Sequence, residues 1–164
     1  MKIRSRLNPS KPCFSFEFFP PKTPEGEKQL WDTLEDLRSL EPGFVSVTSG
    51  AGGSTRDRTI ELVTHIKERT GIEAMAHLTC VGHTKEEIAE VLSRLAKARV
   101  ENVLALRGDP PKGQATFQRT EGGLGFGTLT FLADSSGAVT AYGWSGTWSE
   151  WYVVTKVVFG RVSK

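Results

Sequence analysis

Polar side chains that could carry out acid–base or binding chemistry stand at the ends of four short apolar segments. Glu17 offers a carboxyl group, Thr48 a hydroxyl group, and His77 an imidazole. The turn Arg107–Asp109 offers a cation, a glycine and a carboxylate. A structural protein has little reason to end four consecutive segments in this way. We therefore interpret the four ends as parts of one site.

Glu17 lies in an aromatic segment, Phe14–Phe19, that stops at Pro20-Pro21. Aromatic residues favour a strand, and the prolines end it. Strand alternation gives one face with Phe14, Phe16 and Phe18 and a second face with Ser15, Glu17 and Phe19. A carboxyl group flanked by phenylalanines is expected to be poorly solvated, which favours its protonated form and suits a general acid. The alternative is a glutamate on the solvent face of an edge strand.

The turn Arg107–Asp109 follows an apolar segment, Asn102–Leu106, that has the pattern of a buried parallel strand. Open α/β sheets and α/β barrels bind ligands just past the carboxyl ends of such strands. Gly108 has no side chain, so a flat ligand could approach its backbone. The alternative is an ordinary turn at the end of a strand, because Gly-Asp-Pro is common in turns.

Two further patterns are weaker signals. Gly50, Gly52 and Gly53 follow a strand and could cradle a phosphate, but their spacing misses the dinucleotide fingerprint, and a plain loop is the preferred interpretation. The spacing of His77, Cys80 and His83 resembles that of zinc ligands, yet no carboxylate partner accompanies them. We therefore predict no metal, and a histidine that stacks on or hydrogen-bonds a cofactor.

The elements that must position these residues repeat about every 30 residues, as in alternating βα units. Strands are predicted at 14–19, 44–48, 74–79 and 102–106, with amphipathic helices between them, the first of which is predicted to reach Glu41. The predicted caps are Thr23 before the first helix, Gly71 after the second, and a Thr84–Glu87 capping box before the third. Alternating units imply parallel pairing with right-handed crossovers. Pattern alone leaves an open doubly wound sheet and part of an eight-stranded barrel as alternatives, and a complete barrel needs more residues.

Composition narrows the function classes. The 164 residues allow one domain with a sizeable core, and the net charge of +2 is too small to indicate a nucleic-acid or membrane partner. No apolar run has the length of a membrane span, and no signal peptide is evident. Two isolated cysteines, Cys13 and Cys80, fit a reducing cytoplasm, so we expect a cytoplasmic location.

Five segments together resemble the methylenetetrahydrofolate reductase family, and they cover the chain from about Pro12 to Phe126. These segments are Phe14–Pro21, Val47-Thr48 with Arg56–Thr59, Ala76–Cys80, Ala105–Pro110 and Glu121–Phe126. The resemblance implies a TIM-type (β/α)8 barrel, with FAD at the carboxyl ends of the strands. This chain would form the first, N-terminal half of that barrel.

The activity implied by the resemblance belongs to one-carbon and methionine metabolism. NADH or NADPH reduces FAD, and the flavin passes hydride to 5,10-methylenetetrahydrofolate, giving 5-methyltetrahydrofolate. Glu17 matches the general acid that protonates N5, and Asp109 matches a carboxylate that tunes flavin and folate. Thr48 would lie by the nicotinamide. Flavin-binding positions are matched by Ser49, Ala51, His77, Arg107 and Gly108. Full-length relatives are expected to be homo-oligomeric.

The resemblance stops after Phe126, where the family continues into a helix. Only 5 of the 38 residues from 127 to 164 are charged, against 35 of the first 126. We therefore divide the chain into a reductase-like part, 1–126, and an off-family tail, 127–164, and our hypothesis for the tail is a frameshift near Gly127. Half a barrel lacks half of its ligand shell, so weak or absent activity is expected. The alternatives are a non-catalytic α/β fragment that binds a partner through its sheet edges, and a small open-sheet nucleotide-binding domain.

Overall fold

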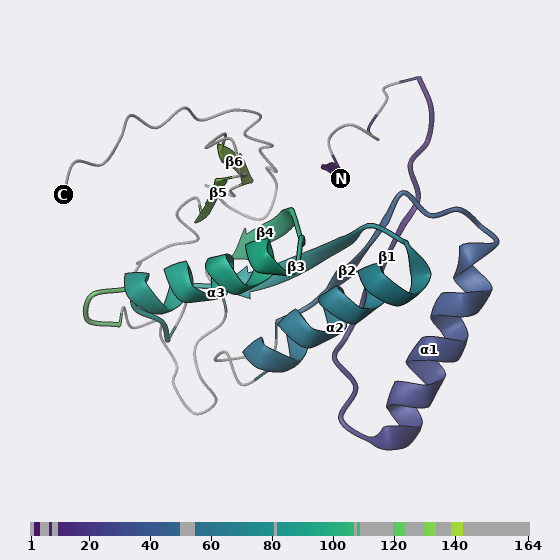
Figure 1. Cartoon of the computed structure of the whole chain (residues 1–164), viewed down its shortest axis with the longest axis horizontal. Helices are drawn as coiled ribbons and strands as arrows, with labels where there is room; N and C mark the ends of the chain where they lie inside the picture. Colours follow the sequence, from purple (N-terminus) through teal and green to yellow (C-terminus); the bar gives the residue numbers. More distant parts are fainter. Residues whose placement is uncertain are drawn as a thin grey trace.

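The computed structural model describes residues 2–3, 7, 10–49, 55–80, 82–106, 108, 120–123, 130–133 and 139–142. Strands and helices alternate through the larger part of it (Figure 1). In chain order, these elements are β1 (Ser15–Phe18), α1 (Pro24–Arg38), β2 (Phe44–Val47), α2 (Arg56–Thr70), β3 (Ala74–Thr79), α3 (Lys85–Lys97) and β4 (Asn102–Leu106).

The sheet has the order β1-β2-β3-β4, and each neighbouring pair of strands is parallel. In Figure 1, α2 and α3 run across the near side of this sheet and α1 stands beside α2. Because strand order follows chain order, each helix connects two adjacent strands. The predicted fold class is confirmed: these are parallel βα units, consistent with the first half of a (β/α)8 barrel.

Helix boundaries follow from the local sequence. The Thr23 hydroxyl accepts a hydrogen bond from the Gly26 backbone N–H at 3.1 Å, and Pro24 starts α1. Both hydrogen bonds of the Thr84–Glu87 capping box are present before α3. Gly71 ends α2 with a left-handed φ of 71°. These predicted caps are confirmed.

The first helix is shorter than its apolar pattern predicted. We expected it to reach Glu41, but α1 ends at Arg38. Glu41 precedes Pro42, whose ring disfavours helical backbone at the residue before it, and Glu41 adopts a φ of 47° instead. Leu40, which has the spacing of the apolar stripe, is 63% exposed.

The two faces of the sheet differ in chemistry because side chains alternate along each strand. The face that packs against the helices is apolar, and it joins Leu34, Ile66 and Leu95 of the three helices in one core. Its buried members include Val45, Val47, Ala76, Leu78 and Val103. The opposite face carries the polar residues Glu17, Ser46 and His77.

The start of the chain is anchored where the strands begin. The Ile3 backbone N–H donates a hydrogen bond to Asn102 Oδ1 at 2.9 Å, and Asn102 Nδ2 donates to Glu73 Oε1 at 2.9 Å. The Lys67 ammonium also contacts Glu73 Oε1 at 2.9 Å. The buried carboxylate therefore has a cation and an amide as partners, as buried charges require.

The described part of the tail is a hairpin of β5 (Thr130–Ala133) and β6 (Val139–Tyr142), which pair antiparallel in a sheet of their own, and β6 lies next to β4. This arrangement differs from the helix that the family pattern predicts after Phe126. The segment 153–159, whose composition resembles a strand, lies outside the described residues.

The helices that the structure describes include none with the length and apolar character needed to cross a membrane.

Candidate active site

Three adjacent strands bring Glu17, Ser46 and His77 together on the face of the sheet opposite the helices. Glu17 pairs in register with Ser46, and Ser46 pairs with Met75, two residues before His77. The Ser46 hydroxyl lies 3.4 Å from Glu17 Oε2, and His77 Nε2 lies 3.3 Å from the same oxygen. Residues 60 positions apart in the chain therefore form one polar cluster.

Glu17 is well solvated, so the expectation of a poorly solvated carboxyl group is wrong. Its side chain is 51% exposed. Phe16 and Phe18 pack against the core on the other face, and Phe14 and Phe19, beyond the ends of β1, are 69% and 74% exposed. In the described residues β1 is also an edge strand. None of these four phenylalanine rings therefore shields the carboxylate from water.

His77 is buried at the centre of the cluster. Desolvation by burial lowers the pKa of its imidazole, and the negative charge of Glu17 opposes this shift. The imidazole is therefore neutral at pH 7. Its Nε2 atom has no hydrogen-bond partner among the described residues. A buried polar atom of this kind needs a ligand or a small adjustment of its neighbours to be satisfied.

The loop after β2 is held by backbone contacts. The Thr48 N–H donates to the Phe18 carbonyl at 2.9 Å, which continues the β1–β2 pairing toward the rim. The Thr48 carbonyl accepts a hydrogen bond from the buried Thr59 hydroxyl at 3.0 Å. The Ser49 hydroxyl donates to the His77 carbonyl at 2.9 Å. Two predicted cofactor-binding residues, Thr48 and Ser49, are thus placed at the rim next to His77.

The turn after β4 is described only at Gly108, which has a φ of 86°. A residue with a side chain rarely adopts this conformation, so glycine is needed here for the backbone itself. The predicted site residues Ala51, Arg107 and Asp109 lie outside the described residues. The expectation that Glu17 and Asp109 face each other across the rim stays a prediction.

Ser46 and Thr59 belong to the site but were missed from the sequence. Ser46 is a polar residue inside the apolar strand β2, and alternation from Thr48 would have placed it on the same face. Thr59 lies in the segment Arg56–Thr59 that carries the family resemblance, and its contact with Thr48 spans 11 positions.

His77, Cys80 and His83 have the spacing of zinc ligands in the sequence, but their side chains do not converge in space. His77 lies on the polar face, whereas the Cys80 side chain belongs to the hydrophobic core on the other face. Within the described ranges, no group of three His, Cys, Asp or Glu side chains could hold a metal ion.

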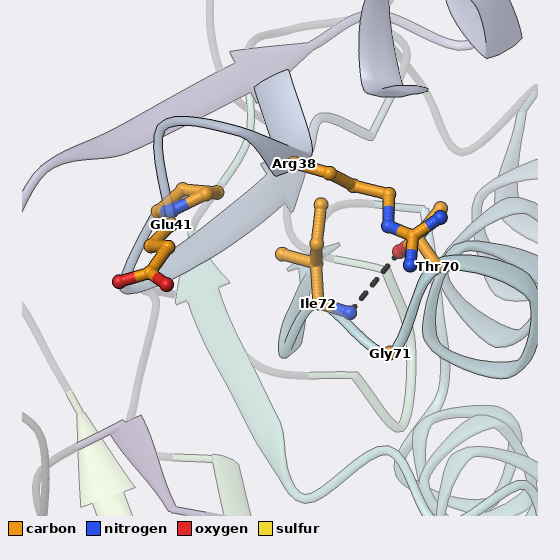
Figure 2. Close-up of a pocket in the computed structure, with 6 residues that line it drawn as sticks. Arg38, Glu41, Thr70, Gly71 and Ile72 are labelled. Atoms are coloured by element: carbon orange, nitrogen blue, oxygen red, sulfur yellow. Dashed lines mark hydrogen bonds between the residues drawn. The ribbon is translucent and has the colours of Figure 1, made fainter. Parts of the chain in front are cut away.

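A shallow pocket of about 350 Å³ lies at the opposite end of the sheet, where the strands begin (Figure 2). It is lined by Arg38, Glu41, Pro42, Thr70, Gly71 and Ile72. The Thr70 hydroxyl already donates to Ile66 and accepts from the Ile72 N–H, drawn as the dashed line in Figure 2. Arg38 forms an ion pair with Glu35. The polar side chains of Arg38 and Thr70 thus have partners within the chain, and the pocket is remote from Glu17.

Comparison with known proteins agrees with the strand-end motifs. Residues 2–132 match the family model described as methylenetetrahydrofolate reductase. A reductase named methylenetetrahydrofolate reductase (NADH) 1 from Arabidopsis thaliana is 44% identical over 123 residues, which are 75% of this chain and 21% of the relative. The 5,10-methylenetetrahydrofolate reductases of Salmonella typhimurium and Escherichia coli are 44% and 48% identical, over 78% and 60% of this chain.

The chain spans less than half the length of these relatives, at most 43% for the Salmonella enzyme. The family match nevertheless covers all four parallel strands and the residues of the polar cluster. The chain belongs to the methylenetetrahydrofolate reductase family.

Proposed function

We propose that this chain provides the N-terminal half of a site that reduces 5,10-methylenetetrahydrofolate to 5-methyltetrahydrofolate, with FAD as cofactor and NADH or NADPH as reductant. The observation that carries the proposal is the cluster of Glu17, Ser46 and His77 at 3.3–3.4 Å on the polar face of the sheet. Family membership supplies the reaction class. A cytoplasmic location is part of the proposal, and the presence of only two cysteines, Cys13 and Cys80, far apart in the sequence, supports it.

The residues present fit a polar, planar cofactor. His77 offers a buried Nε2 atom that lacks a partner among the described residues, and Gly108 offers a backbone without a side chain. FAD, when bound, supplies the hydride chemistry, which no side chain can perform. The residues assigned to holding it are Thr48, Ser49, Ala51, His77, Arg107, Gly108 and Asp109.

Glu17 is assigned the role of general acid toward N5 of the folate. Its half-exposed side chain can reach a ligand above the sheet and can take up a proton from water after each transfer. Asp109 is assigned to tuning the field at the flavin and folate rings. We expect weak or absent turnover from this chain by itself, because four strands supply only part of the ligand shell of an eight-stranded barrel.

Flavin binding tests the proposal directly. Purified chain titrated into FAD should quench flavin fluorescence at a defined stoichiometry, and His77→Ala should weaken that binding roughly tenfold, as expected for the loss of one buried hydrogen bond. Glu35→Gln, on the exposed surface of α1, is the matched control and should bind as the unaltered chain does.

Absence of any FAD binding would overturn the cofactor assignment and favour the second candidate, a non-catalytic α/β fragment that binds a partner through its sheet edges. The observation that favours this alternative is that β1 and β4 each pair with only one strand in the described part of the chain. NADH-dependent turnover by the purified chain would instead contradict the expected weakness of half a barrel.

A further inference from the structure

We propose that the outer edge of β1 is the contact surface for a second copy of this chain, and that the two β1 strands pair antiparallel about Phe16. The inference does not rest on the proposed reaction, because it concerns the edge of the sheet and not the binding of flavin or folate. It adds one residue to the polar cluster, because this pairing brings Ser15 of one copy next to Glu17 of the other.

The backbone of β1 has hydrogen-bonding groups for one more strand. The carbonyls of Phe14 and Phe18 accept backbone hydrogen bonds from the β2 side, at 2.8 Å and 2.9 Å. Backbone groups alternate in direction along a strand, so Ser15 and Glu17 direct their N–H and C=O groups away from β2. Among the described strands β1 pairs with β2 alone, whereas β4, at the other end of the sheet, has β6 next to it. In this part of the chain the edge of β1 is therefore open to a partner strand.

Large apolar side chains at both ends of β1 are in contact with water. Phe14 and Phe19 are the two most exposed large apolar side chains of the described residues. An open edge strand that carries exposed aromatic residues is a site at which two chains associate strand to strand. The same edge serves both copies, so the contact is symmetric and closes at two copies.

The sequence around β1 favours one register for this pairing. Pro12 and Pro20 stand on either side of β1, and Phe16 lies midway between them. Centring the pairing on Phe16 therefore gives the longest overlap that excludes both prolines, which cannot donate to a partner strand. A pairing centred on Glu17 would instead place two carboxylates directly opposite each other, and like charges in that position are destabilising. Overlap and charge thus select the same register.

This register is favourable on both faces of the joined sheets. Ser15 of each copy forms a hydrogen-bonded backbone pair with Glu17 of the other, with Cα atoms about 5.5 Å apart. Both side chains lie on the polar face, so the Ser15 hydroxyl can donate to the half-exposed carboxylate of the other copy. On the helix face, Phe14 lies opposite Phe18 of the other copy, which covers an exposed ring with an aromatic neighbour.

The experiment is sedimentation equilibrium of the full chain, without flavin or folate, over a concentration series from the micromolar to the millimolar range. We expect the apparent mass to rise with concentration from 18.0 kDa to twice that value, because short edge contacts of this kind are weak. Ser15→Pro removes an outward N–H of β1 without removing a hydrogen bond to β2, and it should abolish the rise. Ser15→Ala keeps that N–H, so it is the matched control and should still dimerise.

Amide hydrogen exchange of the unaltered chain tests the register and needs no variant to fold. The N–H groups of Ser15 and Glu17 should be protected at high concentration and should exchange freely after dilution. The N–H groups of Phe16 and Phe18 face β2, so they should stay protected at both concentrations.

A chain that stays monomeric throughout the series, or one that grows beyond two copies, would overturn the inference. Concentration-dependent protection on β4 in place of β1, or a folded Ser15→Pro variant that still dimerises, would also overturn it, because the interface would lie elsewhere. Circular dichroism shows whether Ser15→Pro is folded, and the exchange measurement decides if it is not. A monomer that binds FAD refutes this inference alone, and a dimer that does not bind FAD refutes the proposed function alone.

Discussion

At the scale of single residues, the site depends on which side chains are buried and which stay in water. His77 is buried and neutral, and Glu17, 3.3 Å away, is half-exposed. A buried histidine next to a solvated carboxylate is a stable arrangement, because the charge stays where water can solvate it. Ser49 contributes by bonding the His77 carbonyl, which fixes the backbone that carries the imidazole.

The burial of His77 makes folding stability depend on pH. The pKa of His77 is lowered in the folded chain from its ordinary value of 6.5, so the unfolded chain binds more protons below that pH. The stability that the neutral imidazole contributes is therefore present above pH 6.5 and is lost as the pH falls below it. Urea unfolding at a series of pH values should show this fall, and His77→Gln should make it shallower. An equal slope in both proteins would contradict the assignment.

At the scale of elements, short signals at helix ends set where each βα unit begins and ends. The capping box of α3 satisfies two backbone N–H groups, those of Glu87 and Thr84. The same threonine bridges to Gly123, so the start of α3 also holds the turn Thr120–Gly123. A Cβ atom on Gly123 would lie 2.4 Å from the His83 carbonyl, so only glycine fits this contact.

Thr84→Ala removes this cap, and we expect it to lower the free energy of unfolding by about 1 kcal/mol. Chemical denaturation measures the change. Thr64→Ala is the matched control, because Thr64 lies inside α2 and its hydroxyl bonds only the preceding turn at Ile60. Alanine is the better helix former at such a position, so the control should be neutral or slightly stabilising. A control that loses as much stability as Thr84→Ala would show that the cap is not the cause.

At the scale of the whole molecule, the hairpin of the tail forms a sheet of its own, and its strand β6 lies next to β4 of the parallel sheet. The core cluster draws on residues from Leu30 to Val103, whereas β5 and β6 pair only with each other in a two-stranded sheet. Isolated two-stranded hairpins are at best marginally stable in water. The division of the chain near Phe126 therefore predicts that the four βα strands fold without the tail.

A chain ending at residue 126 should unfold at nearly the same urea concentration as the full chain. The two free energies of unfolding should agree within about 0.5 kcal/mol. Circular dichroism with urea measures both midpoints. The spectrum of the first 126 residues should keep the helix and strand signals of the four βα units. The matched comparison is a chain ending at residue 101, which loses β4 and should lose the cooperative transition. A large drop in stability for the chain ending at 126 would show that the tail belongs to the folded unit. The frameshift hypothesis has a separate test, which is to resequence the gene.

The sequence by itself determined the βα order, the parallel pairing, the helix caps at Thr23, Gly71 and Thr84, and the family. These features depend on local patterns, namely hydrophobic period, capping residues and motifs within a few positions of one another. The predicted end of α1, at Glu41, is three residues beyond the observed end at Arg38. The reason is that Leu40 has the spacing of the apolar stripe although its side chain is exposed.

Only the tertiary structure decided the solvation of Glu17 and its contacts with Ser46 and His77. Solvation depends on which strand forms the edge of the sheet, and the contacts depend on the register of three strands from distant parts of the chain. Neither is encoded in the residues next to Glu17. The phenylalanines around it suggested a buried acid, but alternation along β1 points Phe16 and Phe18 to the other face, and the carboxylate is left in water.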